Sequence, residues 1–183
     1  MSASAAPAPT VVGPDELFAP QSWDPPEVQQ AKEVLRQAVQ CRFISLTPLL
    51  PLVLNLKGKR YTLKNHAPFE PLFSTIRAPV LTLKSGRQCG KSASLRAEGI
   101  LAHLSRPYLS TLYVTPLFEM IRRFSSDMSL LIEESPPRHL MKVKDSVLHK
   151  VFANKSQMYF SFAFLDATRC RGVPAGRNVI DEC

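Results

Sequence analysis

Three stretches of the chain carry apolar residues at helical spacing, and each predicts an amphipathic helix. They begin near residues 24, 91 and 117. Spacings of three and four residues place apolar side chains on a single face of a helix. The positions are Val28, Ala31, Leu35, Ala38 and Val39 in the first stretch, Ala93, Ala97, Ile100, Leu101 and Leu104 in the second, and Leu117, Met120, Ile121, Phe124, Met128 and Leu131 in the third.

Short runs of β-branched and apolar residues predict strands at about 80–84, 111–115 and 178–181. A further pair of such runs predicts a hairpin over 147–162, with its turn at Asn154. Helices that alternate with strands in this way favour an α/β fold, in which a mostly parallel central sheet is flanked by helices.

The first third of the chain divides into two regions before the main domain at 65–183. Residues 1–23 are rich in alanine, proline and serine without periodicity, and they predict a flexible tail. Residues 24–64 predict an N-terminal helix and a lead-in segment. Asp24 is expected to cap this helix, which should end near Cys41.

A turn at Lys57 and Gly58 is predicted inside the lead-in segment, followed by a short strand at 60–63. This part of the chain is basic, and the cluster fits either a solvated hairpin or a surface that contacts nucleic acid. The cluster consists of Lys57, Lys59, Arg60 and Lys64.

The strand predicted at 80–84 leads through a glycine-bearing turn into Gly-Lys-Ser and the second helix, which is the order that a phosphate-binding loop requires. Amide groups at a helix start attract anions, and the helix dipole adds favourable potential. We predict that Gly90 lets the backbone close around the β-phosphate of ATP. Lys91 would reach the β- and γ-phosphates, and the Ser92 hydroxyl would bind Mg²⁺. The loop consists of Ser85, Gly86, Arg87, Gln88, Cys89, Gly90, Lys91 and Ser92.

The loop departs from the usual pattern at one position, since Ser85 stands where a glycine is expected. Arg87 is predicted to add positive charge that stabilises the γ-phosphoryl group as it transfers, and the alternative is a surface arginine that pairs elsewhere. Cys89 is interpreted as a small spacer.

A second motif, Asp181 and Glu182, follows the last predicted strand. Ligands of open α/β sheets bind at the carboxyl ends of strands, so these carboxylates are expected near the phosphate loop. Asp181 would hold Mg²⁺ through water, and Glu182 would be the catalytic residue that orients and polarises the attacking water. An Asp-Glu pair is common by chance, and it gains weight here from the loop upstream.

Residues 68–73 predict a short extended segment just before the phosphate loop. Phe69 or Phe73 would stack on the adenine base, and Glu70 would accept a hydrogen bond from its exocyclic amine. The alternative for the two aromatic residues is a place in the hydrophobic core.

Composition narrows the class of protein. A hydrophobic content of 45% in 183 residues is enough for a substantial core. The formal net charge of +8 favours a polyanionic partner, with a solvated basic face as the alternative.

No cysteines stand in a C-x-x-C pattern or at metal-ligand spacing to histidine, which argues against zinc and favours a reducing cytoplasm. The first residues carry no basic region, so we expect no secretory signal, and the most apolar run, 46–56, is too short to span a membrane.

The loop and acidic motif together resemble the large terminase subunits of tailed double-stranded-DNA bacteriophages. Arg-Gln-x-Gly-Lys-Ser is the most specific part, since it is similar to the arginine-containing Walker A loop of that family, where Ser85 would be usual. The resemblance covers about residues 65–183, and its matching stretches are 86–92, 112–116, 168–172 and 179–182.

The resemblance implies an ASCE-type P-loop NTPase that is the ATPase motor of viral DNA packaging. Such a motor uses ATP and Mg²⁺ to move double-stranded DNA into a procapsid in the host cytoplasm. Its implied partners are the portal protein and the small terminase subunit, and it would assemble as a homo-oligomeric ring without contacting a membrane.

Two departures from the family pattern leave questions open. The adenine segment of the family usually carries a glutamine, and residues 67–74 contain none, which weakens the assignment of Phe69 and Glu70. The coupling motif, the remaining strands and the nuclease domain expected after Glu182 are not in this sequence, so we expect part of a longer polypeptide, incomplete at its C-terminus. The alternatives to the DNA-packaging ATPase are a helicase-like P-loop DNA translocase and an inactive basic DNA-binding fragment.

Overall fold

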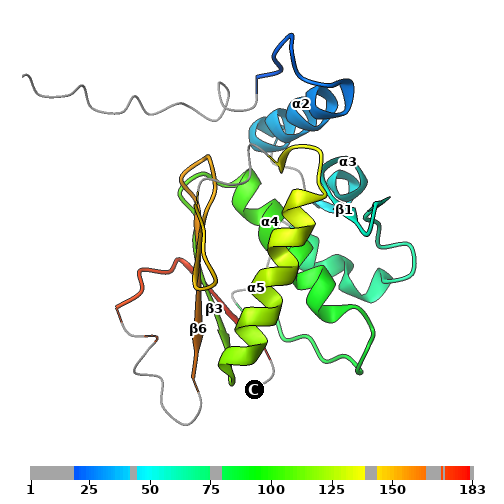
Figure 1. Cartoon of the computed structure of the whole chain (residues 1–183). Coiled ribbons are helices and arrows are strands. Elements are labelled where there is room, and N and C mark those ends of the chain that lie inside the picture. Colours follow the sequence, from blue (N-terminus) through cyan, green and yellow to red (C-terminus); the bar gives the residue numbers. More distant parts are fainter. Residues whose placement is uncertain are drawn as a thin grey trace, which may run out of the picture.

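The computed structural model describes residues 19–41, 45–74, 80–138, 144–163, 170 and 172–181. Over these residues one sheet packs against helices, so the predicted α/β class is confirmed (Figure 1). The elements in chain order are α2 (Pro26–Cys41), η1 (Thr47–Leu49), α3 (Leu50–Val53), β1 (Asn55–Leu56), β2 (Lys59–Arg60), η2 (Ala67–Phe73), α4 (Lys91–Ser105), β3 (Ser110–Thr115), α5 (Phe118–Glu133), β4 (Lys144–Asp145), β5 (His149–Val151), β6 (Gln157–Phe162) and β7 (Arg177–Ile180).

The main sheet has five strands in the order β4-β5-β6-β3-β7. Strand β3 is its parallel centre, because β6 and β7 both run parallel to it. The pairs β4-β5 and β5-β6 are antiparallel. The expectation of a mostly parallel sheet is therefore wrong, since the sheet is mixed. The cause is the predicted hairpin at 147–162, which is confirmed and joins the sheet as adjacent antiparallel strands.

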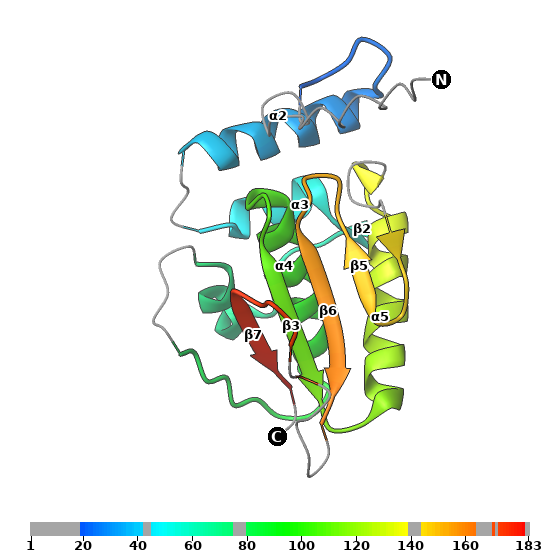
Figure 2. The same ribbon diagram turned by 90° about the vertical axis from the view of Figure 1, so that its left-hand side faces the viewer.

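Helices α4 and α5 cover one face of this sheet, and Figure 2 shows the sheet in front of them. Both helices and strand β3 lie where the sequence predicts them. Gly99 in α4 lets the methyl groups of Met128 and Met158 approach, since an added Cβ would lie 3.4 Å and 3.5 Å from them. The core therefore fills the space between these helices and the strands, and its side chains without exposed area include Ile100, Leu101, Ile121, Met128 and Phe152.

The first helix is confirmed as α2, which spans Pro26–Cys41. Asp24, predicted as its cap, accepts hydrogen bonds from the Gln21 amide at 2.8 Å and from the Lys32 ammonium at 2.6 Å. Both charged side chains are buried, with 5% and 6% exposed for Lys32 and Asp24. This ion pair fixes the chain that enters α2 against the helix.

The strand predicted at 80–84 is not present, since residues 80–86 form neither helix nor strand. Val80 and Leu81 are exposed, and Leu83 is partly buried against the core. β-branched residues favour a strand only where a neighbouring strand completes the hydrogen-bonding ladder. Among the described residues, no strand pairs with this segment or with the outer edge of β7.

The segment predicted as extended at 68–73 is instead the 3-10 helix η2. Its apolar side chains explain the difference, because Phe69, Leu72 and Phe73 reach the core together only when the backbone coils. The turn at Lys57 and Gly58 is confirmed between β1 and β2, and both residues have positive φ, 53° and 70°.

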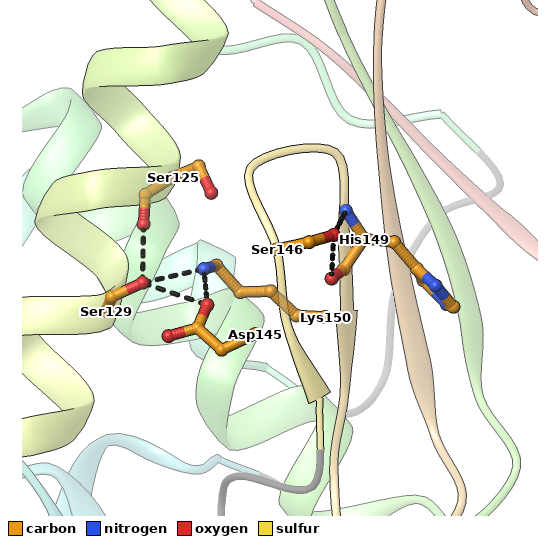
Figure 3. A network of polar contacts seen from close by, with 6 residues as sticks. All are labelled: Ser125, Ser129, Asp145, Ser146, His149 and Lys150. Atoms are coloured by element: carbon orange, nitrogen blue, oxygen red, sulfur yellow. Dashed lines mark hydrogen bonds and ion pairs between the residues drawn. The ribbon is translucent and has the colours of Figure 1, made fainter.

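A polar network around the buried Lys150 attaches the β4-β5 hairpin to α5 (Figure 3). Lys150 forms an ion pair with Asp145 and donates a hydrogen bond at 2.7 Å to the Ser129 hydroxyl of α5. On the outer side, the Ser146 hydroxyl donates to the His149 carbonyl at 2.9 Å and accepts from its amide at 3.1 Å. The network holds the antiparallel edge of the sheet in place, far along the sheet from the phosphate loop.

Candidate functional site

The loop predicted to bind phosphate ends in a conformation that favours glycine. Gly90 has φ of +88° and stands immediately before α4, and Gln88 also has positive φ, 58°. The first helical hydrogen bond runs from the Ser94 amide to the Gly90 carbonyl at 2.9 Å. Within the described residues, the amides of Ser92 and Ala93 have no hydrogen-bond acceptor. Unpaired amides at a helix start form a positive site for an anion.

The structure brings the two predicted motifs together. The Lys91 ammonium lies 2.9 Å from Oδ1 of Asp181, and their side chains are 23% and 8% exposed. Asp181 reaches this place because β7 lies beside β3, and the Asp181 amide donates to the Val114 carbonyl at 2.9 Å. The carboxyl end of the parallel strands therefore meets the start of α4, as the sequence predicts for a site of this kind.

Tyr113 supports the acidic side of the site, and the sequence analysis missed it. Its hydroxyl donates to Oδ2 of Asp181 at 2.6 Å, so the carboxylate is held by Tyr113 and Lys91 together. The Tyr113 ring is buried in the middle of β3 and stacks on Phe124 with centroids 4.2 Å apart. A tyrosine inside a predicted core strand was the available signal, because a buried phenol hydroxyl requires a partner.

Cys89 is placed among polar groups of the loop. Its thiol donates a hydrogen bond to the Gly86 carbonyl at 2.9 Å. The pKa of Cys89 is lowered, first by a hydrogen bond from Ser85 and then by the Lys91 amide and ammonium, while partial burial opposes the shift. Hydrogen-bond donors stabilise the thiolate more than the thiol. The same donors would stabilise a phosphate oxygen.

Two side-chain contacts fix α4 relative to its neighbours. The Tyr61 hydroxyl lies 3.1 Å from the Ser94 hydroxyl, one turn into the helix, and burial raises the pKa of Tyr61. Further along, Arg177 of β7 donates at 2.7 Å to the buried carboxylate of Glu98. The strand that carries Asp181 and the helix that carries Lys91 are therefore tied together outside the site as well as within it.

The other predicted site residues lie in different environments. Ser92 is half-buried in the first turn of α4, whereas Ser85, Gly86, Arg87 and Gln88 are exposed. Phe69 is 3% exposed and belongs to the core, so stacking on a base would require its ring to leave the core. Glu70 is exposed on η2, and Glu182 lies outside the described residues.

The oxygen atoms that the site offers as metal ligands fit a magnesium ion that retains several water ligands. Mg²⁺ prefers oxygen ligands and is often held by one or two carboxylates together with phosphate oxygens. Asp181 supplies a carboxylate after β7, and Ser92 supplies a hydroxyl in the first turn of α4. No cluster of three or more His, Cys, Asp or Glu residues suited to a metal ion occurs in the part of the chain that the structure describes. The protein alone therefore offers a partial ligand set.

No described helix is long and apolar enough to cross a bilayer. Comparison of the chain with protein-family models, curated proteins and solved structures gave no match.

Proposed function

We propose that this chain binds ATP between the start of α4 and the end of β7 and contributes to its hydrolysis. The observation that carries this proposal is the contact between Lys91 and Asp181 at 2.9 Å, beside a helix start with unpaired amides. A partly buried ion pair at a random place in a fold has no reason to adjoin a glycine with φ of +88° and a Gly-Lys-Ser sequence. The combination supports a P-loop NTPase fold as the finer description of this α/β domain.

Each residue of the site has a distinct proposed role. Lys91 would exchange Asp181 for the β- and γ-phosphates, because the phosphate oxygens carry more negative charge than one carboxylate. The amides of Ser92 and Ala93 would donate to phosphate oxygens. Asp181 and Ser92 would hold Mg²⁺, whose positive charge, when bound, neutralises the phosphate oxygens. Arg87 is exposed in the loop and would supply further positive charge to the γ-phosphoryl group.

Glu182 follows Asp181 directly and is proposed to orient and polarise the attacking water. Replacing Glu182 by glutamine should preserve ATP binding and stop hydrolysis, because the amide has a similar shape and no negative charge. Binding would be followed with a fluorescent ATP analogue and hydrolysis by phosphate release. Unimpaired turnover in the variant would contradict the role given to Glu182.

The wider activity that we propose is that of a DNA-packaging ATPase, the large terminase subunit of a tailed bacteriophage. The Arg-Gln-x-Gly-Lys-Ser sequence of the loop supports this proposal, and the net charge of +8 suits a double-stranded DNA partner. Under this proposal the portal protein and small terminase subunit are partners, the ring is homo-oligomeric, and the motor acts in the host cytoplasm.

Replacing Lys91 by alanine tests the nucleotide site most directly. We expect ATP affinity to fall about 100-fold or more, because charge-assisted contacts to phosphate are among the strongest polar contacts. Arg123→Ala is the matched control, since it removes an exposed positive charge from the outer side of α5. Equal ATP affinity in Lys91→Ala and Arg123→Ala would contradict the proposal.

A second candidate is a polyanion-binding protein without ATPase activity. The specific observation in its favour is that residues 80–84, which should form the strand before a phosphate loop, lie outside the sheet. This candidate predicts binding of DNA without binding of ATP. Titration with ATP at millimolar concentration separates the two, since saturable binding that depends on Lys91 supports the ATPase.

A further inference from the structure

The imidazole of His66 lies directly against the phosphate loop. A Cβ added to Gly90 would come within 2.9 Å of Cε1 and 3.1 Å of Nδ1 of this ring, and the three nearest atoms all belong to it. The ring therefore occupies the side of Gly90 on which any other residue would carry its side chain. His66 is 24 residues upstream in the sequence and is no part of the Gly-Lys-Ser motif.

The backbone on both sides of His66 is attached to the core, which fixes the position of the ring. The His66 amide donates to the Leu63 carbonyl at 2.8 Å, and the His66 carbonyl accepts from the Phe69 amide at 2.9 Å. Leu63 and Phe69 are both buried, and the His66 and Phe69 rings pack at an angle of 47° with centroids 6.2 Å apart. Tyr61 attaches the same segment to α4 through Ser94.

The polar atoms of this ring are available to a ligand. His66 is half-buried, and in the described part of the chain its nitrogens take part in no hydrogen bond or ion pair. A neutral imidazole has one N–H donor and one acceptor, and a protonated imidazole has two donors. A donor that adjoins Gly90 and the unpaired amides of α4 is suited to an anion bound at this loop.

We propose that His66 donates a hydrogen bond to the polyphosphate chain of the bound nucleotide. The proposal rests on the proposed function and assigns to that site a ligand residue from outside its loop. The chemical class recognised is a chain of linked phosphates, and the base plays no part in this contact. His66 would then contribute equally to the affinity for ATP and to the affinity for inorganic tripolyphosphate.

The test compares calorimetric titrations of ATP and of inorganic tripolyphosphate with the unmodified protein, His66→Ala and His66→Phe. We expect His66→Ala to weaken both ligands by a similar factor of roughly ten, as for loss of a hydrogen bond to a charged group. His66→Phe retains a ring beside Gly90 and lacks the donor, so it should bind as weakly as His66→Ala. His149→Ala is the control, since it removes a half-exposed histidine from β5.

Several results would overturn the inference. Recovery of affinity in His66→Phe would show that the ring acts only by packing. Loss of ATP affinity without loss of tripolyphosphate affinity would show contact with the base, and tighter binding by His66→Ala would show that the ring blocks the site. Unchanged affinity in His66→Ala overturns this inference alone. If the unmodified protein binds neither ligand, the proposed function fails and the inference fails with it.

Thermal unfolding of each variant, followed by circular dichroism, keeps the comparison valid. Loss of affinity in a variant that melts within about 4 °C of the unmodified protein supports a contact with the ligand, because a shift of that size corresponds to a small loss of stability. If His66→Ala is unfolded at the titration temperature, His66→Asn, which retains a donor in a smaller side chain, replaces it. Binding by His66→Asn that exceeds binding by His66→Phe supports the donor, and the reverse order overturns it.

Discussion

The two ends of helix α4 differ in what satisfies their backbone groups. At the C-terminal end, the side-chain amide of Asn154 donates to the carbonyls of His103 at 2.6 Å and Leu104 at 3.1 Å. The Ser156 hydroxyl also donates to the His103 carbonyl, at 3.0 Å. At the N-terminal end, the amides of Ser92 and Ala93 have no acceptor among the described residues.

We interpret this difference as one between a helix end that serves stability and the helix end to which we assign the proposed ligand site. Helix ends leave several backbone groups without helical partners, and a protein that only needs stability supplies them from its own side chains. Near the C-terminal end of α4, side chains of the protein supply these partners, and His103 and Leu104 are buried. The N-terminal end is half-buried and adjoins the Lys91 ammonium, which is paired with Asp181, and the His66 imidazole. Unpaired amides beside an ammonium and an imidazole fit the anion that we propose for this place.

The largest effect on stability is expected from Asn154→Ala. The change removes two hydrogen bonds to buried carbonyls near the C-terminal end of α4. The Leu104 carbonyl and the Ser156 backbone amide lose this partner, whereas the His103 carbonyl keeps the Ser156 hydroxyl. We expect the free energy of unfolding to fall by about 2 to 4 kcal/mol, since each buried unsatisfied group costs about 1 to 3 kcal/mol. Urea denaturation measures the loss. ATP affinity of the folded variant should stay within about twofold, and a large loss of affinity would contradict the separation of the two ends.

Tyr113→Phe should show a smaller effect that falls on the N-terminal site. The variant keeps the stack on Phe124 and removes the hydrogen bond to Asp181. We expect a loss of about 1.5 to 3 kcal/mol in stability, as for a hydrogen bond to a charged group, and weaker dependence of ATP affinity on Mg²⁺. Titrations of ATP with and without Mg²⁺ provide the second measurement. Unchanged Mg²⁺ dependence would mean that Tyr113 supports the fold without tuning Asp181.

His103 should make the C-terminal end of α4 sensitive to acid. Burial lowers the pKa of His103 from 6.5, although hydrogen bonds to the Gly99 and Gln157 carbonyls act in the opposite direction. The unfolded chain therefore binds a proton more readily than the folded chain. The contribution to stability is full above about pH 6.5 and is lost as the pH falls toward the folded-state pKa. Stability at pH 7.5 and pH 5.5 should differ less in His103→Gln, and an equal difference would contradict this assignment.

The smallest effect expected is a change in the alkylation rate of Cys89. The lowered pKa of this thiol predicts iodoacetamide labelling at a lower pH than for an ordinary thiol. Bound ATP should slow the labelling several-fold, because its phosphates would compete for the donors that stabilise the thiolate. Labelled Cys89 is quantified by peptide mass spectrometry, with Cys170 as the internal control. Equal slowing at both cysteines would indicate a general effect of ATP.

Local patterns predicted much of the fold and half of the site. Helical spacing located α2, α4 and α5, and the Gly-Lys-Ser and Asp-Glu motifs led to the approach of Lys91 and Asp181 that the structure shows. Each of these features depends on residues that are close together in the sequence. The proposal that ATP binds there remains a prediction.

The features that sequence reasoning missed depend on residues far apart in the chain. Residues 80–84 have strand propensity and find no partner strand, and η2 coils because three apolar side chains turn toward one core. Tyr113 and His66 join the site only through tertiary contacts, with Asp181 and with Gly90. His66 stands outside every motif, and the sequence predicts Tyr113 only as part of the strand at 111–115, so the sequence alone assigns neither side chain to the site.

Tyr113 and Asp181 are 68 residues apart in the sequence, and β7 must already be in register beside β3 for their hydrogen bond to form. The proposed ligand site therefore exists only in molecules that have completed folding, since a chain with local helices alone has no Asp181 beside Lys91. A ligand that recognises this arrangement would shift the unfolding equilibrium by mass action and raise the melting temperature with concentration. The saturation stoichiometry of a titration would accordingly count the native fraction of a preparation.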